Sequence, residues 1–113
     1  MLIKSLNKIK YPTYNITQEV ISKQNPVIFL QILHYTVIDY SKEIYQMFLD
    51  KNYQLCFKSD LGFLQNIYKL MIKEMCIKPE INVKNFLENR FIEKKMNLCH
   101  MIIQKIISIE EGI

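Results

Sequence analysis

The chain of 113 residues is half apolar and carries a formal net charge of +4. A chain of this length can form one domain whose hydrophobic core needs no metal ion or disulfide bond. Its two glycines exclude a P-loop and a dinucleotide-binding loop, since both require several glycines where backbone amides approach phosphate.

The N-terminal stretch, residues 1–23, predicts a basic helix and then a weaker one. Apolar residues at helical spacing predict a helix over residues 2–10. Tyr11-Pro12 should end this helix, because a residue that precedes proline avoids the helical region. A second short helix is expected over residues 17–23. Four lysines against Glu19 alone leave this stretch with a charge of +3: Lys4, Lys8, Lys10 and Lys23.

The next helix is the most apolar of the chain. Asn25 is a favourable N-cap and Pro26 is suited to the first helical position. The helix should run to about Ile38, and because it is apolar nearly all round, we expect it to be central and buried. Ser41 offers the N-cap of a further helix that ends near Leu49.

Residues 50–52 indicate a turn, and residues 53–57 fit either a short extended piece or one helical turn. Ser59 is then expected to cap a helix with apolar residues at three- and four-residue steps to Met75. Pro79 should close this helix.

Two more helices complete the expected fold. Asn82 caps a short one, and a long, densely apolar one runs from about Phe91 to Ile109. Residues 1–113 are therefore predicted to form a single all-α domain, a compact bundle of about five to seven helices around buried central helices.

The residues that usually carry chemistry lack suitable neighbours. Cys99 and His100 are adjacent, so on a helix they point about 100° apart and cannot share a metal ion. His34 lies in the most apolar helix and is expected to be a core histidine. No carboxylate pair has the apolar setting that would tune one member into an acid. We therefore expect no enzyme activity, cofactor or metal.

The cysteines are odd in number and widely spaced, at Cys56, Cys76 and Cys99. Since no secretory segment is evident, they are typical of buried thiols in a reducing compartment, the cytoplasm. No apolar run approaches the roughly 20 residues that span a bilayer, so no membrane partner is expected. Four methionines at helical spacing are expected to fill the core: Met71, Met75, Met96 and Met101.

A series of landmarks follows in chain order: Tyr11-Pro12, Pro26, Tyr40-Ser41, Ser59-Asp60-Leu61, Phe63, Tyr68-Lys69-Leu70, Lys78-Pro79, Phe86 and Phe91-Ile92-Glu93-Lys94-Lys95. Over residues 2–108, their order resembles the N-terminal domain of the centrosomal protein of 44 kDa family. Arg90 departs from the pattern, since the family tends to have glycine there.

The resemblance implies a calponin-homology-like helical fold, binding to microtubules, and a place at the centrosome, centriole or basal body within the cytoskeleton. It also implies a centriolar WD-repeat partner and a position as the N-terminal domain of a longer protein.

Three basic surfaces are candidates for binding the acidic surface of tubulin, and each could instead be an ordinary solvated helix face. The first consists of Lys4, Lys8 and Lys10, extended by Lys23. The second is the polar face with Lys69 and Lys73, and the third consists of Arg90, Lys94 and Lys95.

Two other functions remain open from the sequence. One is a protein-interaction domain that recognises a centriolar partner, or a second copy, through exposed apolar side chains. The other is nucleic-acid binding, against which the pattern argues, because the two strongest helices are apolar almost throughout and cannot enter a groove. No small-molecule substrate is expected.

Overall fold

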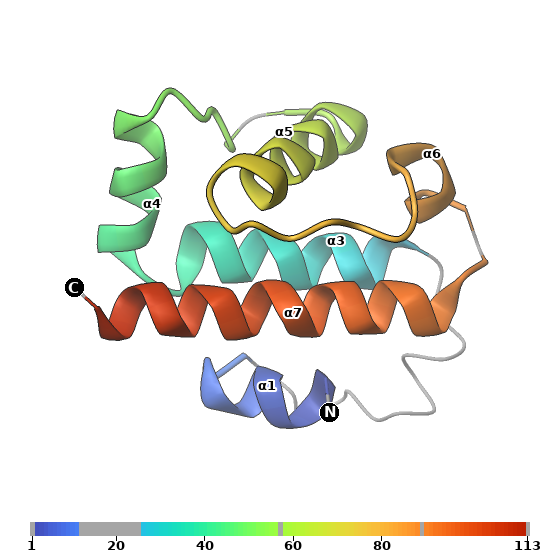
Figure 1. The fold of residues 1–113 in the computed structure, drawn as a ribbon, viewed down its shortest axis with the longest axis horizontal. Coiled ribbons are helices and arrows are strands. Elements are labelled where there is room, and N and C mark those ends of the chain that lie inside the picture. The colour runs from blue at the N-terminus through green and yellow to red at the C-terminus, as the bar shows by residue number, and fades with distance from the viewer. Residues whose placement is uncertain (1, 12–25, 57, 89, 113) are drawn as a thin grey trace.

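Helix α7, which spans Ile92–Glu111, is the longest helix and runs through the middle of the domain (Figure 1). This computed structural model describes residues 2–11, 26–56, 58–88 and 90–112. These residues form six α-helices and one π-helical segment, and none of them forms a strand. The other elements are α1 (Leu2–Lys8), α3 (Pro26–His34), the π-helical η1 (Tyr35–Asp39), α4 (Lys42–Asp50), α5 (Asp60–Lys73) and α6 (Val83–Phe86).

The remaining helices are arranged around α7. Helix α1 contacts α7 on one side, and α3 runs along it on another (Figure 1). Helix α4 contacts α7 near the C-terminal end of α7. Helices α5 and α6 contact each other and lie above α3 in the view of Figure 1. The result is a compact domain of 37 × 28 × 25 Å. The prediction of a compact all-helical bundle is confirmed, and its calponin-homology-like character stays a prediction.

One hydrophobic core joins these helices. Side chains from α3, α4, α5 and α6 meet in its interior, and α7 contributes a continuous buried face. Four phenylalanines and several aliphatic residues are fully buried there: Phe29, Phe48, Phe63, Phe86, Leu6, Ile9, Ile32, Leu33, Ile44 and Leu55. The most apolar predicted helix is largely buried and lies between α5 and α7 in the view of Figure 1, while α7 also contacts α1, α4 and η1.

Three predicted N-caps are confirmed. The Ser41 hydroxyl accepts a hydrogen bond from the Ile44 backbone at 3.3 Å. The Ser59 hydroxyl accepts one from Gly62 at 3.1 Å. The Asn82 side chain does the same for the short helix α6. Each such cap satisfies an amide without an intrahelical partner and contributes about 1 kcal/mol.

The predicted helix to Ile38 keeps a helical course but changes type. It is α-helical to His34 and π-helical over Tyr35–Asp39, where the Tyr40 amide bonds to the Tyr35 carbonyl at 2.9 Å. The Thr36 hydroxyl donates to the Ile32 carbonyl at 2.7 Å, which competes with the regular ladder. Such local competition is invisible to a count of apolar residues.

Helix α5 ends earlier than predicted, at Lys73. Met75 is buried, but it lies in the segment that follows the helix, where Cys76 takes a left-handed backbone conformation with φ of 55°. The Ile77 amide returns to the Met71 carbonyl at 2.8 Å and so caps the helix end. Of the stretch left open between strand-like and helical, the described residues 53–56 are not helical.

The expectation that every cysteine is a buried thiol is correct for one of three. Cys99 is buried, and this burial raises the pKa of its thiol to about 12. Cys56 is half-buried and accepts a hydrogen bond from the Tyr45 hydroxyl at 3.0 Å, whereas Cys76 is exposed. All three are free thiols. Met101 is 45% exposed, so the prediction that it fills the core is wrong.

Candidate basic surfaces

The N-terminal lysines lie on the outer side of α1. Lys4 and Lys8 are exposed and one turn apart, so they share a helix face. Lys10 is exposed just beyond the helix, in a left-handed conformation with φ of 58°. None of these three lysines makes an ion pair with another described residue. We call Lys4, Lys8 and Lys10 the α1 patch. Lys23 and the helix predicted over residues 17–23 lie outside the described residues.

Polar contacts hold α1 on α7. Buried Ser5 hydrogen-bonds the Nδ1 atom of His100, and the Gln104 side chain donates to the Ser5 hydroxyl at 3.2 Å. Burial, together with the positive charge of Lys8, lowers the pKa of His100 below its usual value. His100 is thus a half-buried histidine whose ring is hydrogen-bonded across the contact between α1 and α7. That Ser5 is the partner of His100 could not be predicted from the sequence, because it depends on how α1 is positioned along α7.

His34, which was predicted to be a core histidine, is half-buried, and its ring is stacked on a neighbour rather than enclosed in the core. Its ring lies parallel to that of Phe63, with centroids 3.7 Å apart. Burial lowers the pKa of His34, and the carboxylates of Asp60 and Asp39 oppose that effect.

Lys69 and Lys73, the second candidate surface, are exposed on one face of α5, and the structure adds Lys58 to them. A groove of about 520 Å³ lies beside this face. Lys73 continues the same helix face but does not line the groove. The lining residues are Lys58, Gly62, Gln65, Asn66, Lys69 and Val83. Lys58 was not predicted, because it precedes the N-cap, where helical spacing no longer applies, and its place beside Lys69 becomes evident only in the folded structure.

The third candidate surface is divided between solvent and core. Arg90 and Lys94 are exposed, and both cations approach the ring of Phe91, at 4.9 Å and 6.0 Å from its centroid. Arg90 also lies 3.8 Å from a carboxylate oxygen of Glu88. Lys95, in contrast, is fully buried, so the prediction that it contacts a partner is wrong.

Lys95 points into the core because of its place on α7. Residues 98, 99 and 102 follow it at helical spacing and are all buried, which is the signal that the sequence analysis did not use. Its ammonium donates to the backbone carbonyl of Glu88 and lies 5.8 Å from the ring centroids of both Phe29 and Phe86. It therefore holds the turn before α7 in place.

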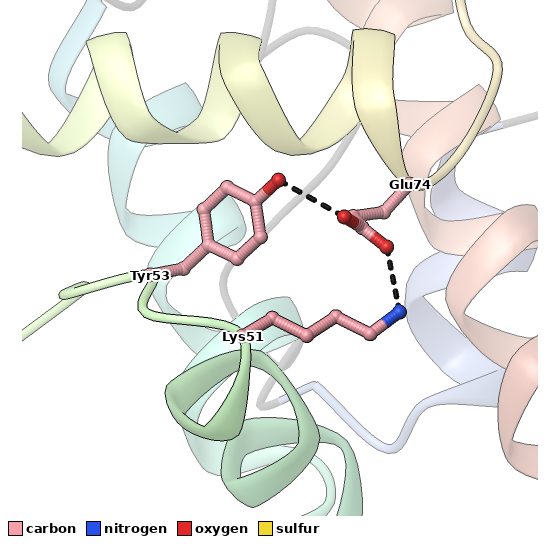
Figure 2. A network of polar contacts seen from close by, with 3 residues as sticks. All are labelled: Lys51, Tyr53 and Glu74. Atoms are coloured by element: carbon pink, nitrogen blue, oxygen red, sulfur yellow. Dashed lines mark hydrogen bonds and ion pairs between the residues drawn. The ribbon is translucent and has the colours of Figure 1, made fainter.

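Lys51 belongs to a local network rather than to a free basic surface. Its ammonium lies 2.7 Å from one carboxylate oxygen of Glu74, and the Tyr53 hydroxyl donates to the other oxygen at 3.0 Å (Figure 2). The hydrogen bonds from Lys51 and then Tyr53 lower the pKa of Glu74. The network joins the segment after α4 to the end of α5 and was not predicted.

Among the described residues, three large apolar side chains are exposed, including Ile72 at 60% and Met101 at 45%. Met101 and Ile77 border a shallow hollow of about 360 Å³. Within the described residues, no cluster of His, Cys, Asp and Glu side chains could hold a metal ion. No described helix is long and apolar enough to cross a membrane.

Comparison with known proteins places the chain in a family. The family described as "Centrosomal spindle body, CEP44" matches residues 1–113. The chain is 28% identical to the centrosomal protein of 44 kDa of Xenopus tropicalis over 106 residues, which cover 94% of this chain and 27% of that protein. It is 30% identical to the human protein of the same name over 76 residues, 67% of this chain and 20% of that protein. The chain thus spans about a quarter of the length of these relatives, and it belongs to the CEP44 family of centrosomal proteins.

Proposed function

We propose that this domain is a non-catalytic, centrosome-associated module that binds microtubules, and that the α1 patch makes the first contact. The observation that carries the proposal is the exposure of Lys4, Lys8 and Lys10 without an ion-pair partner among the described residues. Since tubulin presents an acidic surface, three exposed cations on one side of the domain would raise the rate of encounter.

The α1 patch suits this role because its support is rigid. Leu2, Leu6 and Ile9 are buried beneath it, and Ser5 is hydrogen-bonded to α7. The lysines can therefore bind an extended acidic surface without first ordering a flexible segment. An isolated exposed ion pair is worth about 0–1 kcal/mol, so several contacts must act together.

The proposal includes the place of the domain in the cell. The relatives are named centrosomal proteins, and membership of their family supports a location at the centrosome, centriole or basal body. We extend the proposal to a role as the N-terminal domain of a longer protein that also meets a centriolar WD-repeat protein.

The test is microtubule co-pelleting of two variants matched in charge. Lys4→Glu with Lys8→Glu should weaken pelleting about tenfold or more, because two favourable contacts become repulsive. Lys42→Glu with Lys78→Glu makes the same charge change at two other exposed lysines and should change pelleting less than about twofold. Thermal unfolding of both variants checks that the fold is kept. Equal loss in the two variants, or none in the first, would overturn the role of the α1 patch.

A second candidate function is favoured by the apolar hollow that Ile77 and Met101 border. Through it, the domain would bind a protein partner by burial of apolar surface, which salt does not weaken. Co-pelleting at low and high salt separates the two functions. Binding by the α1 patch falls steeply as salt rises, while binding through the hollow persists and is reduced by Met101→Glu.

A further inference from the structure

We propose a second anion-recognition site, independent of the α1 patch: the groove along α5 binds an acidic peptide segment in extended conformation. We call it the α5 groove. It is bordered by Lys58 and Lys69, which are both exposed, and holds about 520 Å³. No acidic side chain is among its described lining residues. Charge complementarity therefore favours an anionic occupant over a neutral or cationic one.

The groove exists because of the residues at its floor. Gly62 lies in the first turn of α5, where a Cβ atom would be 3.3 Å from the Ser59 hydroxyl oxygen, 3.7 Å from Cβ of Lys58 and 3.9 Å from its Cδ. The lysine stem thus lies closely along the glycine backbone. Any larger side chain at residue 62 would occupy part of the floor. The N-cap bond from Gly62 to Ser59 fixes this turn in place.

The acids nearest in sequence do not compete for these lysines. Asp60 precedes Gly62 by two residues and therefore projects about 200° away around α5. Its charge acts instead on His34, on the side of α5 that faces α3. Glu74 is engaged by Lys51 and Tyr53. Neither Lys58 nor Lys69 makes an ion pair with a described residue.

The dimensions of the groove fit an extended chain. Lys58 lies beside Gly62, and the distance along the helix axis from Gly62 to Lys69 is about 10 Å. Alternate side chains of an extended peptide lie about 7 Å apart on the same face, within the reach of two long lysine stems. Exposed Gln65 lies between the lysines and can donate to a peptide carbonyl, and half-buried Val83 offers an apolar wall for a glutamate stem.

A peptide is favoured over a nucleic acid by the composition of the groove. Single strands bind by stacking bases on aromatic rings or on arginine, as well as through charge. The described lining residues include neither an aromatic residue nor an arginine. The groove supplies two point charges, an amide and an apolar contact, which suit carboxylates on a flexible chain.

The test uses a fluorescein-labelled peptide of ten glutamates, with its binding to the 113-residue chain followed by anisotropy at low salt. Lys58→Gln with Lys69→Gln should weaken binding about tenfold, whereas Lys42→Gln with Lys78→Gln should change it less than about twofold. The basic α1 patch can also attract this peptide, so the comparison is repeated in a Lys4→Gln, Lys8→Gln background, where Lys58→Gln with Lys69→Gln should still weaken binding about tenfold. This background separates the two sites, because it reports on the α5 groove whatever the outcome for the α1 patch in co-pelleting.

A neutral variant tests the shape of the groove. Gly62→Gln keeps the charge and fills the floor with a better helix former. Its Cβ would lie 3.3 Å from the Ser59 hydroxyl oxygen that caps α5, so thermal unfolding must show that this variant keeps the fold. We expect it to weaken peptide binding severalfold. Equal losses in all lysine pairs, or full binding by Gly62→Gln, would overturn the α5 groove and leave only a general charge field. Equally tight, Lys58-dependent binding of a ten-nucleotide thymidine strand would overturn the choice of a peptide.

Discussion

Lys95 and Lys51 each join two parts of the chain. Lys95 does so inside the core and Lys51 at the surface of the domain. Lys95 is fully buried, and its ammonium donates to the Glu88 carbonyl between two phenylalanine rings. Lys51 has a side chain that is 49% exposed and pairs with the carboxylate of Glu74. The charge of Lys51 pairs directly with an opposite charge, whereas the direct contacts of the Lys95 ammonium are a carbonyl dipole and the faces of two rings.

The difference teaches what each lysine contributes. Burial lowers the pKa of Lys95, which means that the core disfavours its charge, although the Glu88 carboxylate opposes this effect. Its stabilising part is therefore the packed hydrocarbon stem and one well-placed hydrogen bond. For Lys51 the stem is solvated and the contribution is electrostatic, so it should respond to salt and pH.

The largest expected effect comes from truncation of the buried lysine. Lys95→Ala removes the stem from among Phe29 and Phe86 and leaves a cavity, which should cost about 3 kcal/mol of unfolding free energy. Lys95→Met keeps most of the stem and loses only the bond to Glu88, at a cost of about 1 kcal/mol. Urea unfolding measures both. Exposed Lys94→Ala is the control and should stay within about 0.5 kcal/mol. Equal costs for Lys95→Ala and Lys95→Met would show that the stem contributes nothing.

A smaller effect on stability is expected from protonation of His100, which lies half-buried where α7 contacts α1. Because the pKa of folded His100 lies below its unfolded value near 6.5, the unfolded chain binds more protons in the window beneath that value. Stability should therefore be constant above about pH 7 and fall as the pH drops through 6.5 toward the lowered pKa.

Unfolding followed at pH 7.5 and pH 5.5 checks this expectation. His100→Gln should remove part of the loss, and His34→Gln should remove another part, since burial lowers the pKa of His34 as well. If His100→Gln lost as much stability between pH 7.5 and pH 5.5 as the parent chain, the contact between α1 and α7 would be insensitive to protonation of this ring. That result would make it resemble a solvated contact more than a buried one.

The comparison of the lysines also marks the limit of sequence-based prediction. Local rules worked where a few adjacent residues decide the outcome, as for the caps at Ser41, Ser59 and Asn82. They failed at Lys95, which was grouped with Lys94 by adjacency although the two diverge by about 100° around α7. The buried residues one turn further along could have placed Lys95 correctly.

Other features could not be predicted from the sequence, because they depend on how distant segments pack in the folded chain. The pairing of Lys51 with Glu74 joins residues 23 apart, and that of Ser5 with His100 joins residues 95 apart. Neither pair has a spacing that a helix or turn would impose. The change to a π-helical turn at Tyr35 and the contribution of Lys58 to the α5 groove likewise depend on which surfaces meet. The exposure of the α1 patch, by contrast, follows from the buried face of a short amphipathic helix.

The smallest expected effect lies at the surface network, and its signature is a dependence on pH. Hydrogen bonds hold the pKa of Glu74 below its usual value near 4.5, so the contribution is complete above about pH 4.5 and is lost as the pH falls through the lowered value. Lys51→Met should therefore be slightly less stable than the parent chain at pH 7, and the difference should vanish at strongly acidic pH. Tyr53→Phe should behave similarly, with a smaller change. Urea unfolding at pH 7 and pH 2.5 measures both. A stability difference for Lys51→Met that stayed the same at both pH values would mean that Lys51, like Lys95, acts through its hydrocarbon stem, and the distinction between the two lysines would fail.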